Sequence, residues 1–145
     1  MTDVSDLLDV KGRSVWSITP EIQVGDALKI MAQKKIGALV VISEGKIAGI
    51  FSERDFARKS IAIKDFSMET LVAGLMSSPV YYVLPGQSVE ECMTLMTEKR
   101  FRHLPVLDED VLIGIVSIGD VVNNLMKEKN AAISDLESYI LRNSE

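Results

Sequence analysis

Two short phrases hold the residue types that could bind a polar ligand. Each reads glycine, two apolar residues, serine, two variable residues and aspartate, over positions 49–55 and 114–120. One carboxylate can hold a diol by accepting two hydrogen bonds, and hydrogen bonds to a charged acceptor are the stronger kind. A serine hydroxyl can donate to further oxygens of the same ligand. The residues that would do this are Ser52 and Asp55 in the first phrase and Ser117 and Asp120 in the second.

The first phrase also offers positive charge for an anion. Arg54 has the forked guanidinium geometry that suits phosphate, and Arg58 follows one helical turn later. Both phrases stand where a strand is expected to pass into a helix, and a helix N-terminus presents free N–H groups to an anion. Serine followed three residues later by an acidic residue is also a capping box, which only starts a helix. A ligand contact and a structural cap therefore both stay open.

The two phrases belong to a longer repeat. They lie 65 positions apart (49 to 114 and 55 to 120), and the same shift aligns residues without a gap over roughly forty positions, which is a sign of internal duplication. Identical pairs include Val15 with Val80, Pro20 with Pro85, Met31 with Met96 and Leu39 with Leu104. We predict a first repeat with its N-terminal lead over 1–70, a second repeat over 71–129, and a C-terminal helical tail over 130–145.

Hydrophobic spacing predicts the same elements in both copies, in the order strand, helix, strand, strand, helix. Strands are expected at 15–18, 39–42 and 47–51 in the first copy and at 80–83, 104–107 and 112–116 in the second. Apolar residues at i, i+3, i+4 and i+7 from Val24 and from Val89 predict the first helix of each copy. Further helices are expected after Ser52, over 71–76, over 121–126 and over 130–141. The result is a mixed α/β (α+β) fold with pseudo-twofold symmetry, whose apolar tail must pack on its own domain or on a partner chain.

The composition is that of an ordinary globular protein, with 47% hydrophobic and 26% charged residues. A net charge of −5 argues against non-specific binding to nucleic acid, which needs a clustered basic face. No run approaches the ~18 apolar residues that span a bilayer, and the acidic N-terminus lacks the basic and apolar signature of a secretory signal. We therefore expect a cytoplasmic protein with no membrane and no nucleic-acid partner.

The residues needed for catalysis or for a metal centre are not evident in the sequence. His103 is the only histidine, and no second histidine or cysteine stands near it, so a metal site is not expected. His103 also lacks a serine or cysteine partner in a recognisable catalytic motif. Cys92 is the single cysteine and cannot form an internal disulfide. We predict no catalytic residue and no enzyme activity.

The repeat resembles the cystathionine-β-synthase-type (CBS) domain, and the chain resembles one tandem CBS pair. The likeness rests on the glycine-to-aspartate phrase in both copies, on Ser-Glu-Arg-Asp at 52–55 and on Arg-His-Leu-Pro-Val at 102–106. The resemblance implies two repeats packed sheet to sheet, a homodimer, and a regulatory module that binds an adenine nucleotide in clefts between the repeats. The ligands it implies are AMP, ATP or NAD(H), with no catalytic cofactor. Output would pass through a regulated partner protein that the sequence does not name.

The resemblance also implies which residues line the two clefts. The first cleft would be lined by Ser52, Arg54, Asp55, Arg58, Met76, Ser77 and Ser78. The second would be lined by Ser117, Asp120, Gly12, Arg13, Ser14, Ile36, Gly37 and Ala38, with Arg102, His103 and Leu104 beside them. The clefts should bind one ligand unequally, because the second copy has Gly119 in place of Arg54 and the first copy has Gly37 in place of Arg102. We expect the Asp55 cleft to be the stronger AMP-type site.

Two other functions stay open. The chain could be a structural element for dimerisation or protein interaction, in which case both aspartates only cap helices. That alternative predicts that Asp55→Ala changes stability and leaves ligand affinity unaffected. The chain could also process the nucleotide, which would require a metal cluster or an activated nucleophile that the sequence does not display.

Overall fold

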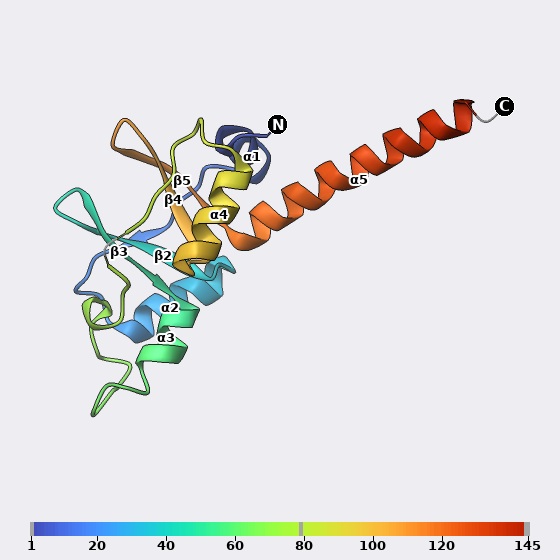
Figure 1. Ribbon diagram of the computed structural model, residues 1–145. Coiled ribbons are helices and arrows are strands. Elements are labelled where there is room, and N and C mark those ends of the chain that lie inside the picture. Colours follow the sequence, from blue (N-terminus) through green and yellow to red (C-terminus); the bar gives the residue numbers. More distant parts are fainter. Residues whose placement is uncertain (1, 79, 144–145) are drawn as a thin grey trace. The chain divides into compact units, whose positions relative to one another are not determined.

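The computed structural model describes residues 2–78 and 80–143, and the chain forms two compact units. We call Ser14–Tyr81 the first-repeat unit, and Met1–Arg13 together with Tyr82–Glu145 the second-repeat unit. Residue 1 of the predicted first repeat and residues 144 and 145 of the predicted tail lie outside the described residues. Figure 1 labels the helices α1 to α5 and the strands β2 to β5.

The first-repeat unit is a three-stranded sheet with two helices. Its elements are β1 (Ser17–Ile18), α2 (Val24–Lys34), β2 (Ala38–Ser43), β3 (Lys46–Ser52), α3 (Glu53–Lys59) and a short 3₁₀ turn, η1 (Val72–Gly74). β1 runs parallel to β2, and β2 runs antiparallel to β3 with Ala38 opposite Ser52. The predicted apolar face of α2 is buried at Val24 and Met31, in one cluster with Phe51 of β3. Burial of this face holds the end of β3, and therefore Ser52, in place.

The second-repeat unit is a β-hairpin with three helices. Its elements are α1 (Val4–Lys11), α4 (Val89–Lys99), β4 (His103–Asp108), β5 (Val111–Ser117) and α5 (Ile118–Asn143). β4 and β5 are antiparallel with His103 opposite Ser117. Val89, Met96 and Val116 are buried together, as their equivalents are in the first-repeat unit. The predicted mixed α/β fold with two copies of one arrangement is confirmed.

We call the stretch that precedes each repeat in the sequence its lead segment. Each unit contains one repeat together with the lead segment of the other repeat. Leu7 and Leu8 of α1 are buried in the core of the second-repeat unit. Val72 and Leu75, which precede the second repeat, are buried in the core of the first-repeat unit. The spatial grouping therefore does not follow sequence order, because the lead segments bury their apolar side chains in the other copy's unit. The predicted limits of the repeats along the sequence stay a prediction.

Some predicted elements differ in the structure. The helix expected over 71–76 is only the single turn η1. The strand expected over 80–83 is reduced to one parallel bridge between Val83 and Val106. The closing helix and the tail helix are one continuous helix, α5, because no glycine or proline interrupts the chain between Asp120 and Asn143. Among the described residues, none of the helices is both long enough and apolar enough to cross a membrane.

Candidate ligand-binding site

Asp55 lies at the start of α3 in a network of hydrogen bonds within the first-repeat unit. Its Oδ2 accepts from the backbone N–H and from the hydroxyl of Ser52, both at 2.9 Å, and its Oδ1 accepts from the Ser77 hydroxyl at 2.7 Å. The Lys59 ammonium lies 3.5 Å from Oδ1 and donates to the Met76 carbonyl at 3.2 Å. Only 13% of the Asp55 side chain is exposed. Both carboxylate oxygens are therefore oriented and already have partners.

Asp120 has the equivalent position at the start of α5 in the second-repeat unit. Its Oδ2 accepts from the Ser117 N–H at 2.8 Å and from the Lys11 ammonium at 2.5 Å. Lys11 also donates to the Ile115 carbonyl at 2.6 Å, which fixes the ammonium beside the carboxylate. The hydrogen bonds from the described residues to this carboxylate all end on Oδ2, and 25% of the side chain is exposed. Oδ1 is therefore the oxygen that Asp120 can offer to a ligand.

The surroundings of Asp120 keep it ionised. Burial raises the pKa of its carboxyl, but the hydrogen bond and charge of Lys11, together with the hydrogen bonds from Ser117, hold that pKa below its ordinary value. By contrast, burial, with a smaller effect from the charge of Glu91, raises the pKa of the Cys92 thiol to about 11. A thiol with such a pKa is protonated at neutral pH, which makes Cys92 a poor nucleophile.

The two aspartates take their lysine from different elements. The 65-residue shift places Lys11 opposite Met76, and Lys59 opposite Asn124. In the second-repeat unit the lysine therefore comes from the lead helix α1, and the last helix carries an amide. In the first-repeat unit the lysine comes from α3, and the lead segment carries a methionine. Each carboxylate is paired with one ammonium, but the charge approaches it from a different element.

The glycine of each phrase is required where a lead segment crosses the strand. A Cβ atom on Gly114 would lie 2.7 Å from a methyl carbon of Leu8. A Cβ atom on Gly49 would lie 2.8 Å from the Ser77 carbonyl oxygen and 2.9 Å from the Met76 sulfur. All three distances are too short for a real Cβ, so a side chain at Gly49 would have to displace backbone, and one at Gly114 would have to displace the methyl groups of Leu8. The close approach brings Lys11 and Ser77 to the aspartates.

Residues 36–38, which the resemblance implies beside Asp120, lie in the first-repeat unit next to Ser52. Ala38 pairs with Ser52 across β2 and β3, and the Gly37 carbonyl accepts from the Glu53 N–H at 3.0 Å. Their expected approach to Asp120 stays a prediction, as does that of Ile36.

In the second-repeat unit, two further predicted residues adjoin Ser117. His103 pairs with it across the hairpin, and the Arg102 carbonyl accepts from the Ile118 N–H at 2.8 Å. Leu104 is fully buried in the core, where its side chain packs against other apolar residues. Of the other residues in the prediction, Gly12, Arg13, Ser14, Arg58 and Ser78 are exposed, and Arg54, Met76 and Ser77 are half-buried. Their role in binding a nucleotide stays a prediction.

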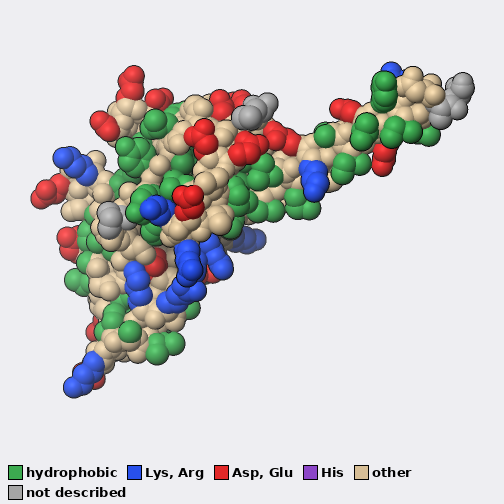
Figure 2. All heavy atoms as spheres, in the orientation of Figure 1, with side chains coloured by type: hydrophobic (Ala, Val, Ile, Leu, Met, Phe, Trp, Pro, Cys, Tyr) green, Lys and Arg blue, Asp and Glu red, His purple; other side chains and the backbone are tan. Residues whose placement is uncertain are grey.

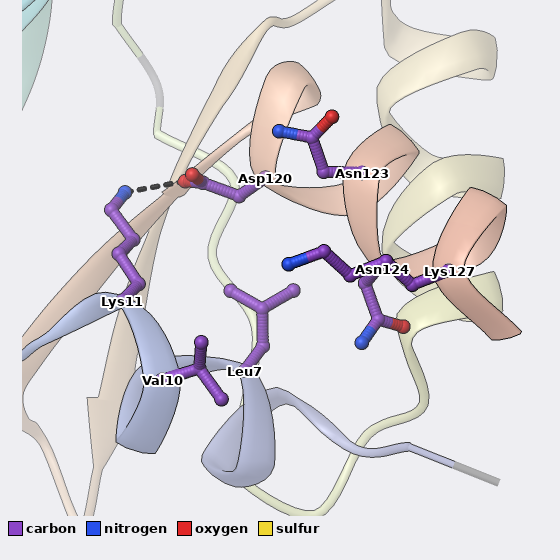
Figure 3. Close-up of a pocket in the computed structure, with 7 residues that line it drawn as sticks. All are labelled: Leu7, Val10, Lys11, Asp120, Asn123, Asn124 and Lys127. Carbon is purple, nitrogen blue, oxygen red and sulfur yellow. Dashed lines mark hydrogen bonds and ion pairs between the residues drawn. The ribbon is translucent and has the colours of Figure 1, made fainter.

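A cavity of about 260 Å³ opens beside Asp120, between α1 and α5. Figure 3 shows its lining, which comes from both helices: Leu7, Val10, Lys11, Asp120, Asn123, Asn124 and Lys127. Sequence reasoning named only Asp120 among these residues. It also missed Lys59, although a lysine four residues after an aspartate on a helix is a recognisable ion-pair spacing. Lys11 carries no such local signal, since it stands 109 positions from Asp120.

Comparisons with known proteins find one family in both halves of the chain. The sequence model of the family described as "CBS domain" matches residues 4–62 and 72–127. A relative from Arabidopsis thaliana, "CBS domain-containing protein CBSX3, mitochondrial", is 39% identical over 149 residues, which cover 96% of this chain and 72% of the relative.

Solved structures show the same likeness. A putative signal-transduction protein with CBS domains from Burkholderia ambifaria has a TM-score of 0.82 and 47% identity, over 87% of this chain and 95% of that one. A hexameric CBS-CP12 protein from bloom-forming cyanobacteria has a TM-score of 0.74 and 28% identity, over 84% of this chain and 70% of that one. The predicted resemblance to a tandem pair is confirmed by these matches.

Proposed function

Because the chain belongs to the CBS-domain family, as a tandem pair of CBS domains, we propose that it is a non-catalytic regulatory module that binds an adenine nucleotide. The ligand is AMP, ATP or NAD(H), and its occupancy is passed to a partner protein. The family comparison supports a signal-transduction class of protein, as in the Burkholderia relative. A module of this kind works only if its ligand binds one conformation better than another.

One observation carries the proposal: each repeat presents an oriented aspartate that could hold a ribose diol. Ser117 and Lys11 fix Asp120, and Ser52 and Lys59 fix Asp55. A carboxylate held in place before binding loses little further freedom when a diol donates to it. An ionised acceptor also makes stronger hydrogen bonds than a neutral one. The lowered pKa of Asp120 keeps this acceptor charged at neutral pH.

Thermal unfolding with AMP, ATP, NAD and NADH, each near 1 mM, tests the proposal. A ligand present at 100 times its Kd should stabilise the protein by about 2.7 kcal/mol, which for a chain of this size raises Tm by several degrees. We expect Asp55→Asn and Asp120→Asn each to reduce the shift. Asp135→Asn makes the same chemical change on the exposed part of α5 and should leave the shift intact. If Tm is unchanged with all four ligands, the nucleotide proposal is contradicted.

Product analysis distinguishes a nucleotide-processing enzyme from a module that only binds the nucleotide. Prolonged incubation of the protein with ATP or NADH should return the nucleotide unaltered. A product that accumulates in proportion to the protein would contradict the non-catalytic proposal.

A second candidate function, self-association, is favoured by the exposed face of α5. The helix is 26 residues long, and its large exposed apolar side chains include Met126, Ile133, Leu136 and Ile140. Figure 2 shows hydrophobic side chains along the projecting helix. The cyanobacterial relative is described as hexameric, and we propose that this chain pairs at least as a homodimer. A cytoplasmic location stays a prediction, since the Arabidopsis relative is named as mitochondrial.

A further inference from the structure

The exposed stripe of α5 has a pattern that is symmetric about Ile133. Met126 and Ile140 stand seven positions before and after Ile133, and Lys129 and Glu137 stand four positions before and after it. Seven residues make about two helical turns and four make about one, so all five side chains lie on one side of the helix. In the two directions from Ile133, an apolar residue is therefore matched by an apolar residue, and the lysine is matched by a glutamate.

These side chains lack the contacts that an apolar helical face ordinarily makes. Met126, Ile133 and Ile140 are between 46% and 57% exposed. Neither Lys129 nor Glu137 takes part in an ion pair among the described residues, and both are exposed. Figure 2 shows hydrophobic side chains along this part of the helix. A helix with an apolar face of this kind requires a second surface to cover it.

We infer that the stripe pairs with the same stripe of a second copy of this chain, with the two α5 helices antiparallel and crossing near Ile133. Each Ile133 then faces its own counterpart. Met126 faces Ile140 of the second copy, and Lys129 faces Glu137 of the second copy. Twofold symmetry forms each of these last two contacts twice, because both copies present the same patch. The inference rests on the proposed self-association and adds the direction and the register of the pair.

A parallel pair does not satisfy the charges of the stripe. In register, each residue would face its own counterpart, so Lys129 would meet Lys129 of the second copy. Like charges opposed across an interface destabilise it, whereas pairs of opposite charge set the orientation of paired helices. A staggered parallel pair could bring one lysine to one glutamate, but it would leave the other lysine and the other glutamate unmatched. The antiparallel pair matches both.

Antiparallel pairing also supports the exposed end of α5. Met126 follows Leu125, which packs against the core of the second-repeat unit, so this part of the helix is held by its own unit. Ile140 lies in the part of α5 where every residue from 129 to 143 is exposed. Contact between Met126 of one copy and Ile140 of the other places each exposed end against a stretch of helix that is already held. A parallel pair would leave the two exposed ends to hold only each other.

Cysteine cross-linking measures the direction of the pair. Met126→Cys and Ile140→Cys are made separately, mixed in equal amounts and oxidised mildly, and mass spectrometry identifies which two copies are joined. An antiparallel pair should give disulfides between one copy of each variant, and none when either variant is oxidised alone. Ala131→Cys, on the opposite side of the helix, is the control that should not cross-link. Cys92 does not interfere, because it is 1% exposed and burial raises the pKa of its thiol to about 11.

Sedimentation velocity of the wild-type protein precedes the cross-linking, because the inference requires an assembly. If the protein is monomeric at every concentration, the stripe is not a self-pairing surface, and the self-association proposal and this inference both fail. If the protein assembles and Met126→Cys cross-links with itself, the helices are parallel, so self-association stands and the inference fails. If the protein assembles but neither the variants nor their mixture cross-link, the interface lies elsewhere and the inference fails in the same way.

An exchange of charges tests the register. Lys129→Glu alone and Glu137→Lys alone should each weaken association about tenfold, because each replaces two attractive pairs by two repulsive ones. The two changes together restore opposite charges across the antiparallel seam, so the affinity should return close to that of the wild-type protein. Lys129→Glu with Asp135→Lys has the same net charge, but its new lysine lies on the opposite side of the helix, so association should stay weak. An exchange variant that regains no affinity would overturn the assigned register.

Discussion

At the scale of single residues, the two aspartates show how one motif acquires different surroundings. The Ser-x-x-Asp phrase is the same in both repeats, and both serines cap their helix. The lysine is not part of the phrase: Lys59 follows Asp55 on the same helix, whereas Lys11 reaches Asp120 from α1. A ligand at either aspartate would therefore meet a positive charge from a different direction. This gives a physical reason for the predicted inequality of the two sites.

Lys11→Met should change how stability depends on pH. Because the pKa of Asp120 is held below its ordinary value in the folded state, the ionised pair stabilises the protein above the unfolded pKa of about 4. That stabilisation is lost as pH falls through the folded pKa. Without Lys11 we expect the free energy of unfolding at pH 7 to fall by about 1 to 2 kcal/mol, and the loss below about pH 4 to become shallower.

Urea unfolding between pH 7 and pH 2.5 measures this effect. Lys64→Met, which removes an exposed lysine that lies outside α1 and outside the apolar stripe of α5, is the matched control. The argument is wrong if the Lys11 variant loses stability toward acid as steeply as the wild-type protein does.

The residue scale also marks the limit of what the sequence could predict. Repetition of the phrase was enough to identify both aspartates and the serines that orient them. Asn124 and Lys127 follow Asp120 by four and seven residues on α5, a helical spacing that the sequence could have shown, but Lys11 meets Asp120 only through the packing of α1 beside α5. Contacts of this kind join positions far apart in the chain, and neither periodicity nor motif spacing records them.

At the scale of elements, the repeated glycines set the position of the lead segments. Gly49 lies against the Ser77 backbone, which exchanges two hydrogen bonds with Ile50, at 3.1 and 2.8 Å. Gly114 lies against the fully buried Leu8 side chain. The sequence predicted the strands that carry these glycines, but not the segments that cross them. The short strand over 80–83 was overpredicted because β-branched and aromatic residues favour strands, whereas the structure has one parallel bridge there, between Val83 and Val106.

Gly49→Ala should destabilise the first-repeat unit. The added Cβ would meet a backbone oxygen at 2.8 Å, so the Ser77 segment must move, and overpacking of this kind costs about 1 to 3 kcal/mol. The movement would also weaken the Ser77–Asp55 hydrogen bond. Gly86→Ala is the control, because a Cβ there has nothing within 4 Å. Urea unfolding of both variants gives the comparison, and equal midpoints would show that the crossing tolerates a side chain.

At the scale of the whole molecule, α5 extends beyond the packing of its own unit. Figure 1 shows its C-terminal half projecting away from β4, β5 and α4 of the second-repeat unit. From Lys129 to Asn143 every residue is exposed. A helix segment of about 15 residues is marginal in water by itself. The sequence predicted the apolar stripe of this tail, but periodicity alone could not decide whether the stripe packs on the same chain.

The stripe has the spacing of a helix that pairs with a copy of itself. Met126, Ile133 and Ile140 recur every seven residues, and Leu136 lies between the last two, which is the pattern of a coiled-coil seam. Self-pairing would bury the exposed stripe, which contributes about 25 cal/mol for each Å² of apolar surface removed from water. Because every copy of the chain carries the same stripe, a second copy always supplies a matching surface.

Two paired substitutions distinguish self-association through this stripe from association elsewhere. Ile133→Glu with Ile140→Glu places two charges on the seam and should convert the assembly to monomers, measured by sedimentation velocity over a range of concentrations. Ala131→Glu with Ser138→Glu places the same charges at the same spacing on the opposite side of the helix, where both positions are exposed. This control should assemble as the wild-type protein does. If the seam variant stays associated, the tail is not the interface and the CBS units themselves must supply it; if wild-type protein is already monomeric, the homodimer proposal fails.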